Sequence, residues 1–225
     1  MKVSIIIPAY NAQNTIRKSV DSALNQKFPK EDFEVIVIND GSTDETSEIL
    51  KKYDKKIKVI NQRNKGFLKA ANHGFRIAEG KYVIKLDADD YFKPTILKEM
   101  VKVLDQKPEI DFVYSNYYEK TPQGWIKIIS TKNNIFNTAG GGVMFRKNKL
   151  AREGFYREDI KFAEYDLLLR TQDKWKGYYI QKPLFYYNRR KESLTGSKKW
   201  LKDSIAQLKK IHPKRLKEIK KIRKY

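Results

Sequence analysis

The sequence contains no cysteine and only two histidines, His73 and His212, among its 225 residues. The absence of Cys excludes disulfides, thiolate nucleophiles, and zinc or iron–sulfur sites built on Cys. Two histidines are too few for a His-rich metal site, and they argue against a Ser-His-Asp triad. No apolar run approaches the roughly 18 residues of a membrane span, and the residues before Pro8 lack the pattern of a signal peptide. We therefore expect the protein to stay in the cytoplasm.

Positive charge is in large excess, with a formal net charge of +21 at pH 7. Residues 198–225 hold twelve Lys or Arg against two acidic residues, which is nearly half of that excess. Apolar residues recur there at helical spacing: Leu201, Ile205 and Leu208 before Pro213, and Leu216, Ile219 and Ile222 after it. We expect a domain over 1–197 and a basic amphipathic helical tail over 198–225. This tail suits an anionic membrane surface, and docking of its apolar face on the domain's own core is the alternative.

Strand and helix patterns alternate along the first half of the chain. Apolar runs predict strands at 3–7, 33–38, 57–60 and 82–86, and apolar periodicity and end signals predict helices at 14–26, 42–52 and 67–78. The second of these helices opens on Ser42–Glu45, which has the spacing of a capping box. Strict alternation predicts an α/β fold with a mostly parallel, Rossmann-like sheet flanked by helices.

The second half of the chain gives weaker signals. The pattern favours a hairpin-like pair at 111–118 and 125–130, a strand at 143–146, a helix at 164–174 and a final strand pair within 178–190. Three consecutive glycines, Gly140, Gly141 and Gly142, permit close approach of the backbone to a neighbour. They could line a sugar pocket or form a turn before the strand.

Polar residues follow each of the first four predicted strands, in the order Tyr10 and Asn11, Asp40, Asn64 with Gly66, and Asp87 to Asp90. Ligands on open parallel sheets bind beyond the carboxyl ends of the strands, so these clusters should meet in one crevice. Each cluster alone has an ordinary explanation as a core or turn residue. Their coincidence at one sheet edge favours a binding site.

Three carboxylates, Asp87, Asp89 and Asp90, end the fourth strand. Like charges packed together repel and raise each other's pKa unless a cation or hydrogen-bond donors compensate. The spacing suits a hard divalent ion held by one or two carboxylates, with phosphate oxygens in the remaining positions. A solvated turn before a helix that opens near Pro94 is the alternative interpretation.

These segments resemble the nucleotide-sugar half of the family 2 glycosyltransferases, which have the GT-A fold. The matching strings are VSIIIPAYN (3–11), VIVINDGSTDET (35–46) and NKGFLKAANHGFRIAEGKYVIKLDADD (64–90). The resemblance implies that 1–100 is the nucleotide-sugar half and 101–197 the acceptor half. A later string, AEYDLLLR (163–170), resembles the catalytic-base segment of the family.

The resemblance also implies roles for single residues. Asp40 would contact the nucleobase with Tyr10 packed near it, and Asp89 with Asp87 would hold Mn²⁺ or Mg²⁺ on the diphosphate. The remaining candidates for nucleotide-sugar binding in this half are Pro8, Asn11, Asn64, Gly66 and Ala88. Arg189 and Arg190, after the last strand, are further candidates to reach the diphosphate, although most exposed arginine pairs bind no ligand.

Two positions depart from the family pattern. The second strand ends in Asn39-Asp40 where the family usually has two Asp, which keeps the nucleobase contact but changes its neighbour. The usual Glu-Asp pair of the base segment is replaced by Ala163-Glu164, so Glu164 falls at the base position and Asp166 is the second candidate. A Glu near a helix start is also favoured by the helix dipole alone.

The chemistry implied is transfer of a sugar with inversion, from a UDP-linked donor to a hydroxyl of a polysaccharide or lipid-linked acceptor. A carboxylate takes the proton of the acceptor, and the metal stabilises charge on the departing diphosphate. The alternatives are a non-catalytic carbohydrate-binding protein, a nucleic-acid-binding protein and a sugar nucleotidyltransferase. Nucleic acid would explain the charge but not the carboxylates, so we expect no nucleic-acid partner. A nucleotidyltransferase would need a Gly-rich phosphate loop where Pro8-Ala9-Tyr10 stands.

Overall fold

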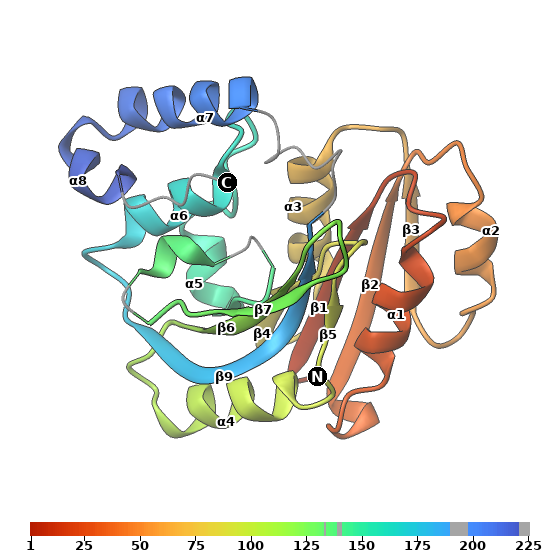
Figure 1. Cartoon of the computed structure of the whole chain (residues 1–225). Coiled ribbons are helices and arrows are strands. Elements are labelled where there is room, and N and C mark those ends of the chain that lie inside the picture. The colour runs from red at the N-terminus through yellow and green to blue at the C-terminus, as the bar shows by residue number, and fades with distance from the viewer. Residues whose placement is uncertain (133, 139–140, 190–197, 221–225) are drawn as a thin grey trace.

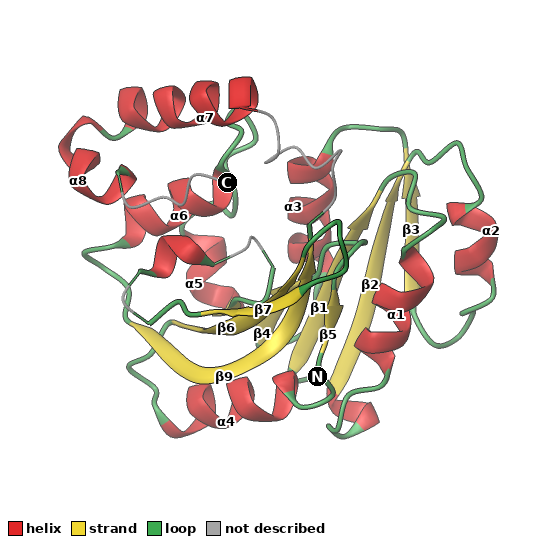
Figure 2. Ribbon diagram, in the orientation of Figure 1, coloured by secondary structure: helices red, strands yellow, loops and turns green. Residues whose placement is uncertain are grey.

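The structure is a computed structural model that describes residues 1–132, 134–138, 141–189 and 198–220. The chain forms an α/β fold in which one twisted sheet lies between helices (Figure 1 and Figure 2). The strand order is β3 (Lys58–Gln62), β2 (Phe33–Asp40), β1 (Val3–Ala9), β4 (Tyr82–Lys85), β8 (Met144–Arg146), β6 (Phe112–Lys120), β9 (Gly177–Asn188) and β5 (Tyr91–Phe92), and β7 (Ile126–Ile129) pairs with β6 beside this path. The sheet is therefore mixed: the first four strands in this order are parallel, and the remaining strands form antiparallel pairs together with the parallel pair of β6 and β9.

The first half follows the predicted alternation of strand and helix. Its elements are β1 (Val3–Ala9), α1 (Ile16–Leu24), η1 (Lys30–Asp32), β2 (Phe33–Asp40), α2 (Thr46–Lys51), β3 (Lys58–Gln62), α3 (Phe67–Ile77) and β4 (Tyr82–Lys85). Strand β1 pairs in parallel with β2 and β4, and β2 pairs in parallel with β3. The prediction of a parallel sheet with helical crossovers is confirmed, and the polar clusters after these strands lie at one edge.

Helix α2 starts later than its predicted capping box. The Ser42 hydroxyl accepts a hydrogen bond from the Asn11 backbone N–H at 3.0 Å, so it connects two loops instead of capping a helix. Asp44 Oδ1 accepts the backbone N–H of Thr46 at 3.0 Å, where the helix begins. The capping-box prediction is wrong because the Ser42 side chain is used by the loop after β1.

The second half contains β5 (Tyr91–Phe92), α4 (Ile96–Gln106), β6 (Phe112–Lys120), β7 (Ile126–Ile129), η2 (Ile135–Asn137), β8 (Met144–Arg146), α5 (Lys147–Arg152), α6 (Ala163–Thr171) and β9 (Gly177–Asn188). Strands β6 and β7 form the predicted antiparallel pair. The predicted final strand pair is wrong, because β9 is one strand that pairs with β6 in parallel and with β5 in antiparallel fashion. Its ladder shifts register between Ser115 and Asn116, opposite Pro183, which has no N–H to donate.

The alternation of side chains along β1 divides the core into two layers. Ile5 and Ile7 join the cluster that includes Val20 of α1 and Leu97 of α4. The intervening Ile6 joins the cluster on the other face, which includes residues of α3, α5 and α6. The carboxyl edge of the parallel strands is thus held from both sides.

The tail consists of α7 (Lys198–Ile211), η4 (Pro213–Arg215) and α8 (Leu216–Ile219). Leu201, Leu208 and Ile219 are buried in the same cluster as Phe162, so most of this apolar face packs on the domain's own core, whereas Leu216 is 45% exposed. The structure therefore corrects the expectation that this face lies in a membrane, whereas Ile222 falls outside the described residues. No helix within the described ranges is long and apolar enough to cross a membrane.

Candidate active site

A cavity of about 310 Å³ opens at the carboxyl edge of β1 and β2. It is lined by Pro8, Ala9, Tyr10, Asp40, Asn64, Gly66, Phe67 and Ala70. The structure thus brings together five of the residues predicted to bind the nucleotide sugar. Tyr10 is 51% exposed, which leaves its ring available to pack on a flat ligand.

Asp40 is held by donors from the last residue of β3 and from the loop after it. Its Oδ1 accepts the Gln62 side-chain amide at 2.6 Å and the Lys65 backbone N–H at 2.9 Å, and Oδ2 accepts the Gly66 N–H at 2.8 Å. Gly66 has φ of 91°, a left-handed conformation that glycine adopts without strain. Because each carboxylate oxygen can accept more than one hydrogen bond, Asp40 keeps capacity for a ligand donor.

His73 supports this arrangement from α3. Its Nδ1 lies 2.7 Å from Gln62 Oε1, and since that oxygen can only accept, the imidazole donates. His73 therefore orients the amide that in turn orients Asp40. This role was not predicted from the sequence, where the available signal was that His73 is one of only two histidines.

Asn11 connects loops and is absent from the residues that line the cavity. It has φ of 47°, and its side-chain oxygen accepts the Thr43 backbone N–H at 2.8 Å. Together with the Ser42 contact, this fixes the loop after β1 to the loop after β2. Asn11 therefore fixes the loop that carries Tyr10, and its own contact with a ligand stays a prediction.

The carboxylate turn after β4 is anchored by β9. The Asn188 backbone N–H donates to Asp90 Oδ1 at 2.8 Å, and its side-chain amide donates to the Asp89 carbonyl. Asp90 is buried, and burial together with the charges of Asp89 and Asp87 raises its pKa well above the usual range of a carboxyl group. Asp90 Oδ2 has no hydrogen-bond partner among the described residues. The turn is therefore an accumulation of negative charge that a cation would relieve.

This donor set fits a divalent ion that is shared with a diphosphate. Within the described ranges, no group of three or more His, Asp or Glu side chains could hold a metal unaided. Mg²⁺ and Mn²⁺ accept carboxylate oxygens, and Mg²⁺ commonly takes only one or two from the protein, with substrate phosphates supplying others. Asp87 and Asp89 are both partly exposed next to the buried Asp90, so they are the side chains that could contact such an ion.

Lys85 connects the carboxylate turn to α6. Its ammonium lies 2.7 Å from Asp87 Oδ1 and 3.2 Å from Glu164 Oε1, and the side chain is 2% exposed. Burial alone would lower the pKa of Lys85, but the charges of Asp87 and Glu164 outweigh burial and raise it, so Lys85 stays charged. The sequence analysis treated 82–86 only as a buried strand. The signal it missed is that a lysine inside such a strand must be paired.

The two candidate bases lie in different surroundings on α6. The Glu164 side chain is 23% exposed beside Lys85, in the first turn of the helix. Asp166 is fully buried, with Arg170 Nε at 3.1 Å and His212 Nε2 at 2.8 Å from its oxygens. A substrate hydroxyl can approach Glu164, whereas Asp166 is enclosed by protein donors.

The remaining predicted residues have structural contacts. Gly142 has φ of 74°, and a Cβ there would meet the Phe185 ring at 2.3 Å, which accounts for glycine at this position. The Arg189 guanidinium is 3.8 Å from the buried Glu119 carboxylate, and this partner was not foreseen. Gly140 and Arg190 lie outside the described residues.

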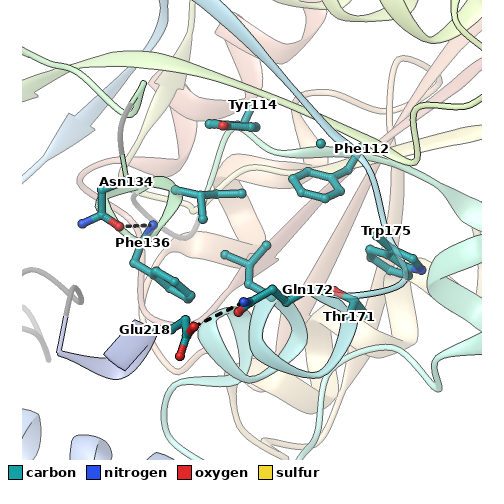
Figure 3. Close-up of a pocket in the computed structure, with 11 residues that line it drawn as sticks. Phe112, Tyr114, Asn134, Phe136, Thr171, Gln172, Trp175 and Glu218 are labelled. Atoms are coloured by element: carbon teal, nitrogen blue, oxygen red, sulfur yellow. Dashed lines mark hydrogen bonds between the residues drawn. The ribbon is translucent and has the colours of Figure 1, made fainter. Parts of the chain in front are cut away.

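A second cavity, also of about 310 Å³, lies near the far end of α6 (Figure 3). Its walls include Phe112, Phe136 and Trp175, all buried, and its rim includes Gln172 and Glu218. None of the residues predicted from the sequence lines this cavity. The clustering of carboxylates and Lys85 therefore makes the carboxyl edge of β1, β2 and β4 the candidate active site.

Comparison with known proteins relates this arrangement to enzymes. Chondroitin synthase from Pasteurella multocida is 32% identical over 199 residues, which is 83% of this chain and 20% of that protein. The chain thus spans about a fifth of the length of this relative. A crystal structure of the fragment TarS 1-349 from S. aureus in complex with UDP is similar with a TM-score of 0.71 and 25% identity, covering 93% of this chain and 66% of that one.

A mannosyltransferase from Pyrobaculum calidifontis, solved in complex with GDP-Man and Mn²⁺, has a TM-score of 0.76 at 19% identity and covers 98% of this chain and 68% of that one. At that identity the likeness establishes the fold, which is the GT-A arrangement expected from the sequence. A profile described as Glycosyl transferase family 2 matches residues 4–157. The chain therefore belongs to glycosyltransferase family 2.

Proposed function

We propose that this enzyme transfers a sugar, with inversion and with a divalent metal, from a UDP-sugar to a hydroxyl of a sugar-containing polymer. The observation that carries the proposal is the chain of contacts Asp87–Lys85–Glu164, which joins the carboxylate turn to a partly exposed carboxylate on α6. The relative named chondroitin synthase and the UDP complex of TarS support a UDP-linked donor and a polymeric acceptor.

In this proposal, different residues bind the donor, hold the metal and accept the proton. The cavity around Tyr10 and Asp40 binds the nucleobase, and Asp89 with Asp87 would hold the divalent ion whose charge stabilises the leaving diphosphate. Glu164 accepts the acceptor's proton while the acceptor oxygen bonds to the anomeric carbon and the bond from that carbon to the phosphate oxygen breaks. The electron pair leaves with UDP. No nucleophile from the enzyme is required, so the configuration inverts.

The test is a binding and transfer screen. Thermal shift with UDP-glucose, UDP-N-acetylglucosamine and GDP-mannose, each with and without Mn²⁺, should show Mn²⁺-dependent stabilisation by the UDP-sugars. NMR of the product should then show an anomeric configuration opposite to that of the donor. Stabilisation by GDP-mannose alone would refute the UDP assignment, and a retained configuration would refute direct displacement.

The second part of the proposal is that the tail attaches the enzyme to a membrane, and the observation that supports it is the positive charge of the tail. The exposed lysines of the tail are Lys199, Lys202, Lys209, Lys210, Lys214, Lys217 and Lys220. Each basic residue near an anionic leaflet contributes on the order of 1 kcal/mol. These residues would hold the enzyme at the cytoplasmic face of a membrane, where a lipid-linked acceptor would be presented.

Charge reversal tests this attachment without disturbing the buried side of α7. We expect the wild type to sediment with vesicles that contain phosphatidylserine and to be released by high salt. Replacement of Lys202, Lys209 and Lys210 by Glu should abolish sedimentation while UDP binding persists. Equal sedimentation of both forms, or equal binding to neutral vesicles, would refute an electrostatic attachment.

A further inference from the structure

The C-terminal segment lies along the whole length of α6 and contacts it from start to end. Just before the helix, the Phe162 ring packs edge-on against Trp200 with centroids 4.8 Å apart. Lys161 also donates its backbone N–H to Gln207 Oε1 at 3.0 Å. These contacts hold the entry to the helix from the side of α7.

The other end of α6 meets α8 and the turn before it. The Gln172 amide donates to Glu218 Oε1 at 3.4 Å, which Figure 3 shows, and Asp173 forms an ion pair with Arg215. Because one partner of each pair, Gln172 or Asp173, is exposed, each contact adds little on its own. Their importance is that they fix α8 to the end of the same helix.

Between the two ends, a fully buried carboxylate joins α6 to the tail. Asp166 Oδ1 lies 2.8 Å from His212 Nε2, and Asp166 Oδ2 lies 3.1 Å from Arg170 Nε. Arg170 in turn donates to the backbone carbonyls of Glu153 and Phe155. A buried carboxylate that loses one of two donors is left partly unpaired, so the position of α6 depends on His212.

Glu164 and Asp166 hold α6 from opposite directions. Residues two apart on an α-helix point about 200° apart around its axis, so the two side chains face different neighbours. Glu164 contacts Lys85 on the side of the carboxylate turn, and Asp166 contacts His212 on the side of the tail. The helix that carries the candidate base is thus held between β4 and the C-terminal segment.

We propose that residues 198–219 form a positioning element of the active site, in which His212 acts through Asp166 to fix the location of Glu164. This inference rests on the proposed role of Glu164 as base. In this proposal the tail contributes to catalysis through its contacts with α6. Donor binding should not depend on it, because none of the described tail residues, 198–220, lines the cavity at β1 and β2.

The experiment compares three full-length variants. His212→Ala removes the donor to Asp166, His212→Gln offers a side-chain N–H in its place, and Lys102→Ala changes an exposed residue of α4 as a control. For each we measure kcat and donor KM with UDP-sugar and Mn²⁺, binding of UDP with Mn²⁺ by calorimetry, and hydrogen–deuterium exchange of peptides from α6 and β1.

We expect His212→Ala to lower kcat by about 10- to 100-fold with donor KM unchanged within about two-fold, because a small displacement of a catalytic group has effects of this size. Exchange should become faster in 163–171 and stay constant in β1. His212→Gln should recover most of the turnover, and Lys102→Ala should match the wild type.

Unchanged turnover or unchanged α6 exchange in His212→Ala would overturn the inference. Loss of UDP binding together with general unfolding would also overturn it, since His212 would then be only a stability residue. The exchange and UDP measurements do not need transfer. A wild-type protein that transfers no sugar would therefore refute the proposed function, while exchange still reports whether His212 holds α6.

Discussion

Asp40 and Glu164, the two carboxylates proposed to act on the substrates, are held by different kinds of contact. Asp40 receives two backbone N–H groups, from Lys65 and Gly66, and one side-chain amide. Glu164 receives the ammonium of Lys85, and its helix is backed by the side chain of His212. The nucleotide region is thus held largely by the main chain, and the catalytic region by side chains from distant parts of the sequence.

This difference has a consequence for mutation. A backbone N–H persists when its residue is replaced by any residue but proline, so donor binding should tolerate single substitutions in the loop after β3 except at Gly66, whose φ of 91° favours glycine. A side-chain donor disappears with its residue, so the position of Glu164 should be sensitive to single substitutions far from it. Donor affinity and turnover should therefore respond to different sets of mutations.

The largest effect is expected at the carboxylate turn, where both regions meet. Asp89→Asn should remove the Mn²⁺-dependent part of UDP binding and reduce transfer to below about 1% of wild type, because ion and phosphates bind as one unit. Calorimetry with UDP, with and without Mn²⁺, gives the comparison. Unchanged Mn²⁺-dependent binding would show that Asp89 is not a ligand.

The two carboxylates of α6 should separate chemistry from structure. Glu164→Gln keeps the size of the side chain and removes proton acceptance, so kcat should fall by roughly 10² to 10⁴ while donor affinity hardly changes. Asp166→Asn should instead lower the melting temperature, because it weakens the contacts with Arg170 and His212. If Asp166→Asn abolishes turnover in a stable protein and Glu164→Gln is nearly normal, the assignment is reversed.

Lys85 should have opposite effects on the two regions. Lys85→Met leaves Asp87 without its cation, so the carboxylate turn should bind Mn²⁺ more tightly by roughly ten-fold. The same change removes the ammonium that holds the Glu164 carboxylate in place, so kcat should fall by a similar factor. Titration of kcat against Mn²⁺ measures both quantities, with Lys85→Arg as the variant that keeps the charge. Weaker Mn²⁺ binding in Lys85→Met would contradict this account of Lys85.

The smallest effect is expected for His73, the counterpart of His212 in the nucleotide region. His73→Ala removes one neutral hydrogen bond behind Gln62 and leaves the two backbone donors to Asp40 in place. UDP affinity should fall by about five-fold, corresponding to about 1 kcal/mol, with kcat at saturating donor unchanged. A fall in kcat without a change in affinity would remove the distinction between the two regions.

Much of the nucleotide region could be predicted from the sequence because its residues follow neighbouring parallel strands of one sheet. Continuous apolar runs set β1, β2 and β4, and parallel strands bring their carboxyl ends together. The grouping of Tyr10, Asp40 and the aspartates follows from that rule. The family resemblance of the same segments added their expected roles.

The surroundings of the two candidate bases, Glu164 and Asp166, could not be predicted from the sequence because they depend on the tertiary structure. Sequence alone left Glu164 and Asp166 as alternatives, since both stand in the first turn of one helix. What distinguishes them is burial and partners: Lys85 beside one, Arg170 and His212 around the other.

The tail shows the same division between sequence and structure. Its apolar periodicity determined that it would be helical and two-faced, but a periodic face is compatible with a lipid surface or with the protein's own core. Packing of Leu201 and Leu208 against the cluster around α6 decided between them. The physical reason is that periodicity specifies which side of a helix is apolar, whereas the surface that covers it depends on contacts between distant residues.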